Sequence, residues 1–384
     1  MAGSGTTRAA VTRGPAVRTA GRAESVRFAA TRAIPFFVRG VPGARPSFSA
    51  ETLRALRDRH GGAPVLVRGL SGRVLVLLDR QDLGQFYAEP AAPEPAPALA
   101  PAPPSCEALR TVIAEEARQL AAASSLELVR VRHAVARLAR RIAPGAPDAA
   151  AVPGPGYEAE APAGPFGRLR RRGAGREWAA AADGHARAGR TAPYAGPAAR
   201  TEPWLRAVDT VPGTLLRTLL LLGTHPAEQD AAAAEAAACT APGELTRLRA
   251  CVLESLRLYP AVPELVRVTR TETEWRGVRH PAGTCVLLPA HFHQRDPVHV
   301  PAAHVFVPGR WKTPGADEDL RMSPFGHGPG RCPGDRLGLL ITTALCAEVL
   351  RRRRITGVRP VLDPPGPLPA VLDPRGIRLT LTRR

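Results

Sequence analysis

Apolar positions repeat with the spacing of helices and strands in some parts of the chain and lose that spacing in others. Ser49 precedes helical spacing that runs to His60, and this predicts a helix with a capped N-terminus. Two apolar runs follow at residues 65–68 and 74–78, with a glycine-containing segment between them. Short apolar runs on either side of a turn predict a β-hairpin. Residues 31–88 are therefore interpreted as an N-terminal helix and a small β-sheet region.

Helical spacing dominates the second half of the chain. Four aliphatic residues there fall three or four positions apart and form one apolar stripe, which predicts a helix. They are Leu245, Leu248, Val252 and Leu256. Residues 265–290 contain short apolar runs separated by glycine and proline turns, and these predict further strands. The whole pattern predicts a mainly α-helical α+β fold, with a helix-rich domain and a small β-rich N-terminal subdomain.

Segments without regular spacing divide the chain into domains. Residues 1–30 carry arginines and few acids, which predicts a disordered tail, although an Arg-rich start is also typical of transit peptides. Residues 89–104 are rich in proline and alanine and predict an extended linker. Residues 105–202 begin with helical spacing and then become rich in proline, glycine and arginine, which predicts a helical and partly disordered region. Residues 203–384 are expected to form the functional core.

The charge balance is strongly basic, with a formal net charge of +19. Such an excess suggests an anionic partner, so a nucleic-acid-binding protein is a distant alternative. However, every basic residue except Lys312 is an arginine, the arginines are spread along the chain, and aromatic residues make up only 4% of it. No nucleic-acid motif is present. We therefore expect no nucleic-acid partner.

Apolar runs and cysteines bear on where the protein resides. No apolar run approaches the roughly 20 residues that span a bilayer, so we expect no membrane span. The N-terminus lacks the continuous apolar core of a secretory signal. The six cysteines include no C-x-x-C pair, which argues against a disulfide framework or a zinc site. The expected location is the reducing cytoplasm, and the expected state is a monomer.

The sharpest candidate for chemistry is the glycine-rich stretch from Phe325 to Gly334, which contains Cys332. Glycine lets a backbone turn tightly and approach a planar ligand closely. Helical apolar spacing begins at Leu337, so the cysteine precedes a helix N-terminus, where backbone N–H groups and the helix dipole favour a thiolate. Phe325 can shield one side of the sulfur. A thiolate in an apolar, glycine-lined loop is a soft ligand that suits a haem iron.

A second candidate is an acid–base pair on the helix that carries the apolar stripe. Glu254 and Arg257 are three residues apart, so their side chains project near each other. Most pairs of this spacing lie on the surface and contribute little to stability. Here the pair precedes, in order, an Arg-Asp-Pro element at residues 295–297, a Pro-Gly-Arg-Trp element that contains Arg310, and the Cys332 loop. Spacing alone favours a surface pair, whereas the ordered set favours a functional one.

This ordered set resembles the cytochrome P450 family of haem-thiolate monooxygenases, of the soluble bacterial type and with a shortened N-terminal half. The resemblance implies a P450-like fold, a haem b cofactor and Cys332 as the axial ligand of the haem iron. It further implies that Glu254, Arg257 and Arg310 form a buried network beneath the haem. The residues that it places against the haem are Arg267, at a propionate, and Phe325, Gly328, Gly330 and Gly334 of the cysteine loop.

The same resemblance assigns an acid–alcohol pair to Asp209 and Thr210, on the family's long central helix. In the family this pair carries protons during oxygen activation, which requires a carboxylate reachable from solvent and a neighbouring hydroxyl. An Asp-Thr pair is also a common helix N-cap, and this alternative stays open. Arg206 stands where the family has a small residue, and Pro212 falls inside the expected helix.

The function that the resemblance implies is insertion of one oxygen atom from O2 into a small apolar organic substrate. Electrons would come from a ferredoxin and its reductase or a similar donor. Two departures from the family pattern support an alternative, a peroxide-using or degenerate haem-thiolate protein with little monooxygenase activity. Residues 89–108 take the place of a propionate-binding helix, and Arg206 would place a cation near the distal side of the haem. In addition, Gly330 stands where the family carries a basic residue that binds a propionate.

Overall fold

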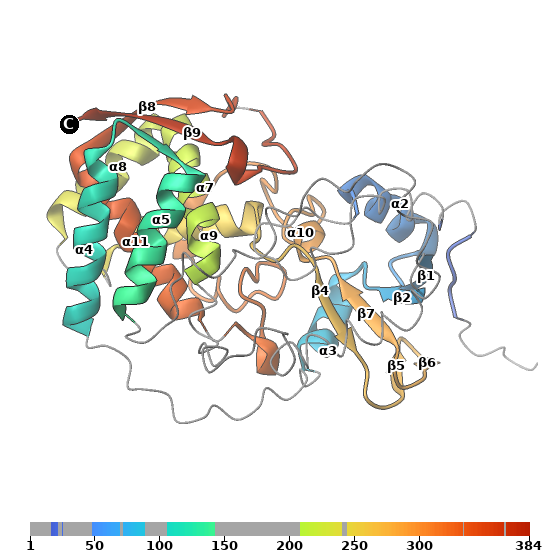
Figure 1. Ribbon diagram of the computed structural model, residues 1–384. Coiled ribbons are helices and arrows are strands. Elements are labelled where there is room, and N and C mark those ends of the chain that lie inside the picture. Colours follow the sequence, from blue (N-terminus) through green and yellow to red (C-terminus); the bar gives the residue numbers. More distant parts are fainter. Residues whose placement is uncertain are drawn as a thin grey trace, which may run out of the picture.

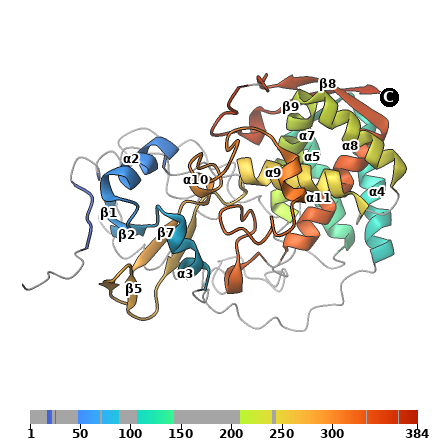
Figure 2. The same ribbon diagram turned by 180° about the vertical axis from the view of Figure 1, so that it is seen from behind.

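The computed structural model describes residues 17–21, 25, 48–69, 72–88, 106–142, 208–239, 244–332, 334–364 and 366–384. They form a helix-rich lobe and a smaller β-rich lobe, which lie side by side in Figures 1 and 2. The mainly α-helical α+β fold predicted from apolar spacing is confirmed. The predicted linker, most of the predicted tail, residues 143–202 and Arg206 lie outside the described residues.

The β-rich lobe is built on a four-stranded sheet with the order β1-β2-β7-β4. Its strands are β1 (Val65–Gly69), β2 (Gly72–Val76), β7 (Cys285–Leu288) and β4 (Leu265–Val268). β1 and β2 form the predicted hairpin, β2 runs parallel to β7, and β4 is antiparallel to β7. A separate hairpin consists of β5 (Thr273–Trp275) and β6 (Val278–His280).

Helices cover both faces of this sheet. α2 (Ala50–His60) shares one buried cluster with Val74 and Val76 of β2, whereas Leu75 belongs to a second cluster with α3 (Leu83–Ala88). Successive residues of a strand point to opposite faces. Because helices cover both faces of the sheet, the side chains of Val74, Leu75 and Val76 are all buried. A strand that is covered on both faces has a continuous apolar run rather than an alternating one, which is the pattern that the sequence shows.

The helix-rich lobe packs around α11 (Asp335–Arg352), which contacts α4, α7, α8 and α9. Its other helices are α4 (Cys106–Ala122), α5 (Leu128–Ile142), α7 (Val211–Thr224), α8 (Pro226–Ala238) and α9 (Thr246–Leu258). A three-stranded sheet crosses one end of these helices (Figure 1). Its strands are β3 (Ser125–Glu127), β9 (Arg378–Arg383) and β8 (Arg353–Arg359). α7 is buried on nearly every side, as a helix in the middle of a lobe must be.

Short helical turns connect the larger elements. They are η2 (Arg80–Asp82), α10 (Ala290–His293), η6 (Pro308–Lys312), η7 (Gly328–Gly330) and η8 (Pro374–Gly376). Within the part of the chain that the structure describes, no helix combines the length and the apolar content needed to cross a membrane.

Residues 17–21 differ from the expectation of a disordered N-terminal tail. The N–H of Leu66 in β1 donates to Arg18 O at 2.9 Å, and Leu66 O accepts from the N–H of Ala20 at 3.1 Å. The segment therefore lies parallel to β1, and Ala20 is buried against the sheet. The edge strand of a sheet leaves N–H and C=O groups unpaired, and this segment pairs those of Leu66.

His293 gives the β-rich lobe a dependence on pH. Its Nε2–H donates to the carbonyl oxygen of Leu77 at 3.1 Å in the core, and burial lowers the pKa of His293 from 6.5 to about 4. Between these two values the unfolded state binds more protons than the folded state, so stability rises with pH. We expect the free energy of unfolding to fall as the pH is lowered from 6.5 to 4, by at most about 3 kcal/mol from His293.

Urea unfolding at several pH values across this window measures the slope. In the His293→Gln chain the amide can still donate to Leu77 O but does not titrate, so the slope should become shallower. It should not vanish, because burial also lowers the pKa of His291 and of His280. An equal slope in the parent and the His293→Gln chain would show that His293 is not the group responsible.

Candidate active site

The Cys332 loop is a tight turn stabilised by its own backbone. The N–H of Cys332 donates to Phe325 O at 2.9 Å, and the N–H of Arg331 donates to Gly328 O at 3.1 Å. Gly326 and Gly328 have φ values of +71° and +62°, in the left-handed region that side chains rarely adopt. The two glycines therefore allow the chain to reverse direction before it reaches the cysteine.

Cys332 lies at the entrance to α11. The N–H of Asp335 donates to Cys332 O at 3.3 Å, and α11 begins at Asp335 with Gly334 as its N-cap residue. The cysteine is half-buried. The N–H groups in the first turn of a helix lack partners within that helix and stabilise a negative charge nearby. Cys332 thus occupies a position that favours a thiolate.

Two other cysteines have the opposite environment. Cys251 of α9 and Cys346 of α11 are completely buried in the core of the helix-rich lobe, and burial raises the pKa of each thiol far above its ordinary value. A thiol that keeps its proton is a poor metal ligand. The half-buried Cys332, on a turn whose glycines admit a planar ligand, is by contrast a donor that fits a haem iron.

The cation nearest to Cys332 in sequence is already paired. Arg331 is exposed, and its Nε lies 2.7 Å from Oδ2 of Asp335. Gly330, two residues before the cysteine, is exposed as well and has no side chain. The P450 family carries a basic residue at this position, and this loop does not.

Arg267, which we expected at a haem propionate, projects from β4 toward α3. Its Nη1 donates to the carbonyl oxygen of Phe86, and its guanidinium carbon lies 4.5 Å from the centre of the Phe86 ring. α3 also contacts η7 of the Cys332 loop. Arg267 and the Cys332 loop therefore both contact α3, and Phe86 is one partner of the arginine.

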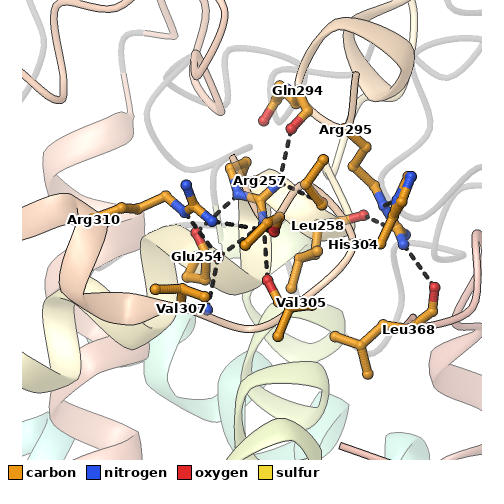
Figure 3. A network of polar contacts seen from close by, with 12 residues as sticks. Glu254, Arg257, Leu258, Gln294, Arg295, His304, Val305, Val307, Arg310 and Leu368 are labelled. Carbon is orange, nitrogen blue, oxygen red and sulfur yellow. Dashed lines mark hydrogen bonds and ion pairs between the residues drawn. The ribbon is translucent and has the colours of Figure 1, made fainter. Parts of the chain in front are cut away.

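Glu254 and Arg257 form a fully buried ion pair on α9, drawn in Figure 3. Arg257 donates from Nη2 to Oε1 of Glu254 at 2.8 Å and from Nε to Oε2 at 2.9 Å, so the pair is bidentate. Burying two charges costs several kcal/mol for each ion unless further hydrogen bonds surround them. Arg257 makes such bonds to the carbonyl oxygens of Gln294, Ala303 and Val305. The guanidinium therefore fixes the backbone that follows α10.

Three more donors converge on the Glu254 carboxylate from the segment around η6. Arg310 Nε donates to Oε1 at 3.1 Å, the N–H of Val307 donates to the same oxygen at 3.0 Å, and Trp311 Nε1 donates to Oε2 at 2.9 Å. The structure thus brings together the three charged residues that the resemblance groups. Val307 and Trp311 had no predicted role, and the one signal in the sequence is that Trp311 directly follows Arg310.

The Arg-Asp-Pro element connects this network to both lobes. Arg295 donates to the carbonyl oxygens of Leu368 and Pro369 at 2.7 and 2.8 Å, which lie in the segment between β8 and β9 (Figure 3 shows the first contact). Asp296 accepts a hydrogen bond from Arg57 of α2 at 2.5 Å. Two adjacent residues therefore hold the helix-rich lobe and the β-rich lobe together.

Asp209 and Thr210 lie in a helical turn directly before α7. Asp209 is exposed and Thr210 is half-buried, so a carboxylate open to water adjoins a less accessible hydroxyl. Thr210 occupies the N-cap position of α7, but its side chain makes no capping hydrogen bond. Thr210 is therefore not a side-chain cap of α7, and the roles of the pair stay predictions.

Pro212 differs from its expected place inside the central helix. α7 begins at Val211, so Pro212 lies in its first turn, where the missing N–H has no helical acceptor to lose. Thr214 Oγ1 donates to Thr210 O at 2.9 Å and ties the preceding turn to the helix. A Cβ on Gly213 would lie 3.6 Å from Pro374 of η8, which places this turn against the segment between β8 and β9.

Comparisons with known proteins point to one family. The family model for cytochrome P450 matches residues 204–380. The chain is 35% identical over 188 residues to a cyclooctat-9-en-7-ol 5-monooxygenase of Streptomyces melanosporofaciens, which covers 44% of this chain and 40% of that protein. It is 35% identical over 162 residues to the mitochondrial 25-hydroxyvitamin D-1 alpha hydroxylase of Homo sapiens, which covers 39% of this chain and 32% of that protein.

The fold has a solved counterpart in the crystal structure of CYP175A1 from Thermus thermophillus. The TM-score is 0.59 at 19% sequence identity, and the match covers 86% of this chain and 94% of the other. This likeness shows the fold alone, and the family match comes from the sequence of residues 204–380. Residues 204–380 match the cytochrome P450 family, as the ordered motifs predicted, and that family implies a haem iron cofactor. The chain spans 40% or less of the length of the two curated relatives named above.

Proposed function

We propose that this chain is a haem-thiolate monooxygenase that inserts one oxygen atom from O2 into a small apolar organic substrate. The observation that carries the proposal is the position of Cys332, half-buried between a glycine-bearing turn and the N-terminus of α11. Further support comes from two relatives whose names describe a monooxygenase and a hydroxylase.

In this proposal the chain holds haem b through residues of the core. Bound haem supplies the chemistry that activates O2 and oxidises a C–H bond. Cys332 Sγ is the iron ligand, and Phe325, Gly328, Gly330 and Gly334 border the haem around that sulfur. Arg267 provides a guanidinium for a propionate, which it can bind through two hydrogen bonds. Glu254, Arg257 and Arg310 keep the backbone beneath the haem in place.

Asp209 and Thr210 move protons in the proposed reaction. The exposed carboxylate of Asp209 exchanges protons with water, and the half-buried hydroxyl of Thr210 can accept one hydrogen bond while it donates another. Together they form a path for a proton from solvent into the site. The electrons come from an external donor such as a ferredoxin with its reductase. We propose that the protein acts as a monomer in the cytoplasm, with no nucleic-acid partner.

The spectrum of the purified protein tests this proposal. After reduction and exposure to carbon monoxide, a strongly red-shifted Soret band is expected, because a thiolate donates electron density to the iron. A preparation without any Soret band, from cells supplied with haem precursor, would refute haem binding. A Soret band without the red shift would refute thiolate ligation.

A peroxide-using or degenerate haem-thiolate protein is the second candidate. Arg267 already donates to Phe86 O, and Gly330 has no side chain. Among the described residues, fewer basic side chains are therefore placed to bind a propionate than the family pattern contains. A peroxide-using protein should turn over an apolar probe with hydrogen peroxide but not with O2 and an electron donor, whereas a degenerate protein should show little turnover with either. Turnover with O2 and the donor, coupled to their consumption, would favour the monooxygenase.

Thr210→Ala tests the proton path. We expect the carbonyl spectrum to persist while product formed per electron falls by about tenfold or more, with the electrons recovered as hydrogen peroxide. Asp209→Asn should slow turnover and change its pH profile, because an amide cannot shuttle a proton. Both quantities are measured with a ferredoxin donor and any apolar probe substrate that is turned over.

Thr218→Ala is a matched control. Thr218 is buried on the same helix, and its Oγ1 donates to Thr214 O, so its loss removes a hydroxyl that only bonds its own helix. If Thr210→Ala couples electrons to product as well as the parent does, Thr210 is not the relay. Thr214, one turn further along α7, is then the residue to substitute.

A further inference from the structure

Tyr87, in the last turn of α3, is packed directly against the Cys332 loop. It is only 3% exposed, and its hydroxyl lies 2.9 Å from Oγ of Ser323, a residue distant in sequence that precedes the loop. Its ring meets the His327 ring edge-on, with 5.2 Å between the ring centres. One side chain therefore contacts both the entry to the loop and its middle.

The direction of the hydroxyl contact follows from the neighbours of Ser323. Ser323 Oγ lies 2.7 Å from the carbonyl oxygen of Leu320, which can only accept, so the serine donates its single proton there. The Tyr87 hydroxyl must then donate to Ser323 Oγ. Burial raises the pKa of Tyr87, so the phenol keeps the proton that this contact needs.

The backbone of Tyr87 also fits closely against the loop. A Cβ on Gly328 would lie 2.2 Å from Tyr87 O, closer than real Cβ atoms approach an oxygen. A Cβ on Gly326 would lie 3.8 Å from Tyr87 Cε1. The loop and the end of α3 are therefore complementary in shape, and Gly328 is needed for this contact as well as for its positive φ.

Two arginines of the β-rich lobe hold α3 and the turn before it. Arg276, in the turn between β5 and β6, donates from Nε and Nη2 to the two carboxylate oxygens of the buried Asp82, at 2.9 and 3.1 Å. Arg267 of β4 donates to Phe86 O at the other end of the helix. The chain is thus held both at Asp82 of η2, directly before α3, and at Phe86 within α3, so that α3 can support the loop.

We propose that Tyr87 is a positioning residue that holds residues 323–332 in the geometry in which Cys332 Sγ binds the haem iron. It acts through Ser323 and the loop backbone. The part of the proposal that concerns iron rests on the proposed function, whereas the restraint on the loop does not.

Hydrogen exchange of the full-length chain tests the restraint. Tyr87→Phe removes only the hydroxyl, whereas Ser323→Ala removes its acceptor together with the hydrogen bond from Ser323 Oγ to Leu320 O. Each should speed exchange of the amides in residues 323–332 by at least about fivefold, the effect of losing one hydrogen bond. The double variant should exchange no faster than Ser323→Ala alone, because the Tyr87 hydroxyl has already lost its acceptor in Ser323→Ala. In the haem-loaded variants, a smaller share of the haem should give the red-shifted carbonyl band.

Tyr259→Phe is the matched control for the hydroxyl. Tyr259 is 4% exposed, and the cations that act on its hydroxyl are Arg295, Arg217 and Arg257, none of which belongs to the loop. Exchange at residues 323–332 should therefore stay at the parental rate. Gly328→Ala should disturb the loop more than Tyr87→Phe does, since it pushes on Tyr87 O. Gly326→Ala separates the two causes of that effect, because Gly326 lies in the same loop with a φ of +71°, but a Cβ there would make only ordinary contacts, at 3.7 Å from Gly330 O and 3.8 Å from Tyr87 Cε1.

The outcomes distinguish this inference from the proposed function. Parental exchange rates in both Tyr87→Phe and Ser323→Ala would overturn the restraint, whatever the spectrum of the protein. Faster exchange with an unchanged carbonyl band would overturn the link between the restraint and the sulfur. If the parent binds no thiolate-ligated haem, the proposed function fails, and the exchange rates still decide whether Tyr87 holds the loop.

Discussion

Replacement of Cys332 by serine is expected to abolish the red-shifted carbonyl band completely. A serine hydroxyl keeps its proton at neutral pH and is a hard donor, so it cannot replace a thiolate as a ligand of ferrous haem. The measurement is the spectrum of the reduced, carbonyl-treated protein, normalised to haem content. Because the substitution replaces one sulfur atom by oxygen at a half-buried position, the chain should still fold.

Two control variants separate ligation from the general effect of losing a thiol. Cys251→Ser and Cys346→Ser each place a hydroxyl in the core, where the thiols are completely buried and keep their protons. They should lower stability and leave the position of the band unchanged in the folded fraction. A parental band from the Cys332→Ser chain would remove the assignment of this residue as the ligand.

Glu254→Gln and Arg257→Leu are expected to destabilise the fold by about 3–5 kcal/mol each, because each leaves a buried charge without its counter-ion. That loss is a large part of the roughly 5–15 kcal/mol by which a native domain is stable. Soluble yield and haem content should therefore fall together. In Glu254→Gln the new NH2 group also faces donors, because Arg257, Arg310, Val307 and Trp311 all point hydrogens at this carboxylate.

Urea unfolding of the soluble fraction measures the loss. Arg310→Leu should be milder than Arg257→Leu, since the Arg310 side chain is 12% exposed and Glu254 keeps its bidentate partner. Glu115→Gln is the control for an exposed pair, as Glu115 meets Arg141 at the surface and screening by water makes such a pair weak. Equal unfolding midpoints for Glu254→Gln and Glu115→Gln would show that burial of the network has no energetic consequence.

The elements predicted from the sequence were those that local spacing determines. The Ser49 cap is present, since the N–H of Thr52 donates to Ser49 Oγ, and the β1–β2 hairpin lies where two apolar runs flank a turn. The proximity of Glu254 and Arg257 follows from helical geometry alone. Whether such a pair is buried depends on which segments pack over it. Here the covering segments belong to residues 294–311, and the order of the motifs was the one feature of the sequence that indicated them.

The contacts that prediction missed join segments far apart in the chain. Tyr87 has no motif around it, and its partner Ser323 is 236 residues away. The contact of Arg267 with Phe86 was not predicted either, because it depends on where the pairing of β4 with β7 places α3 and β4; the assignment of Arg267 to a propionate stays a prediction. The strand-like contact of Thr19 with Leu66 arises because β1 is an edge strand, which the apolar pattern of the first 30 residues does not reveal.

The strand order of the sheet in the β-rich lobe also imposes a delay on folding during synthesis of the chain. β2 ends at Val76, and its parallel neighbour β7 begins at Cys285, about 200 residues later. A ribosome adds roughly 5–20 residues per second, so one edge of β2 waits about 10–40 s for its partner to emerge. An apolar strand with an open edge pairs readily with other chains during such a delay. Slow translation and high expression therefore favour aggregates nucleated at β2, and chaperones that shield nascent chains raise the yield of folded protein.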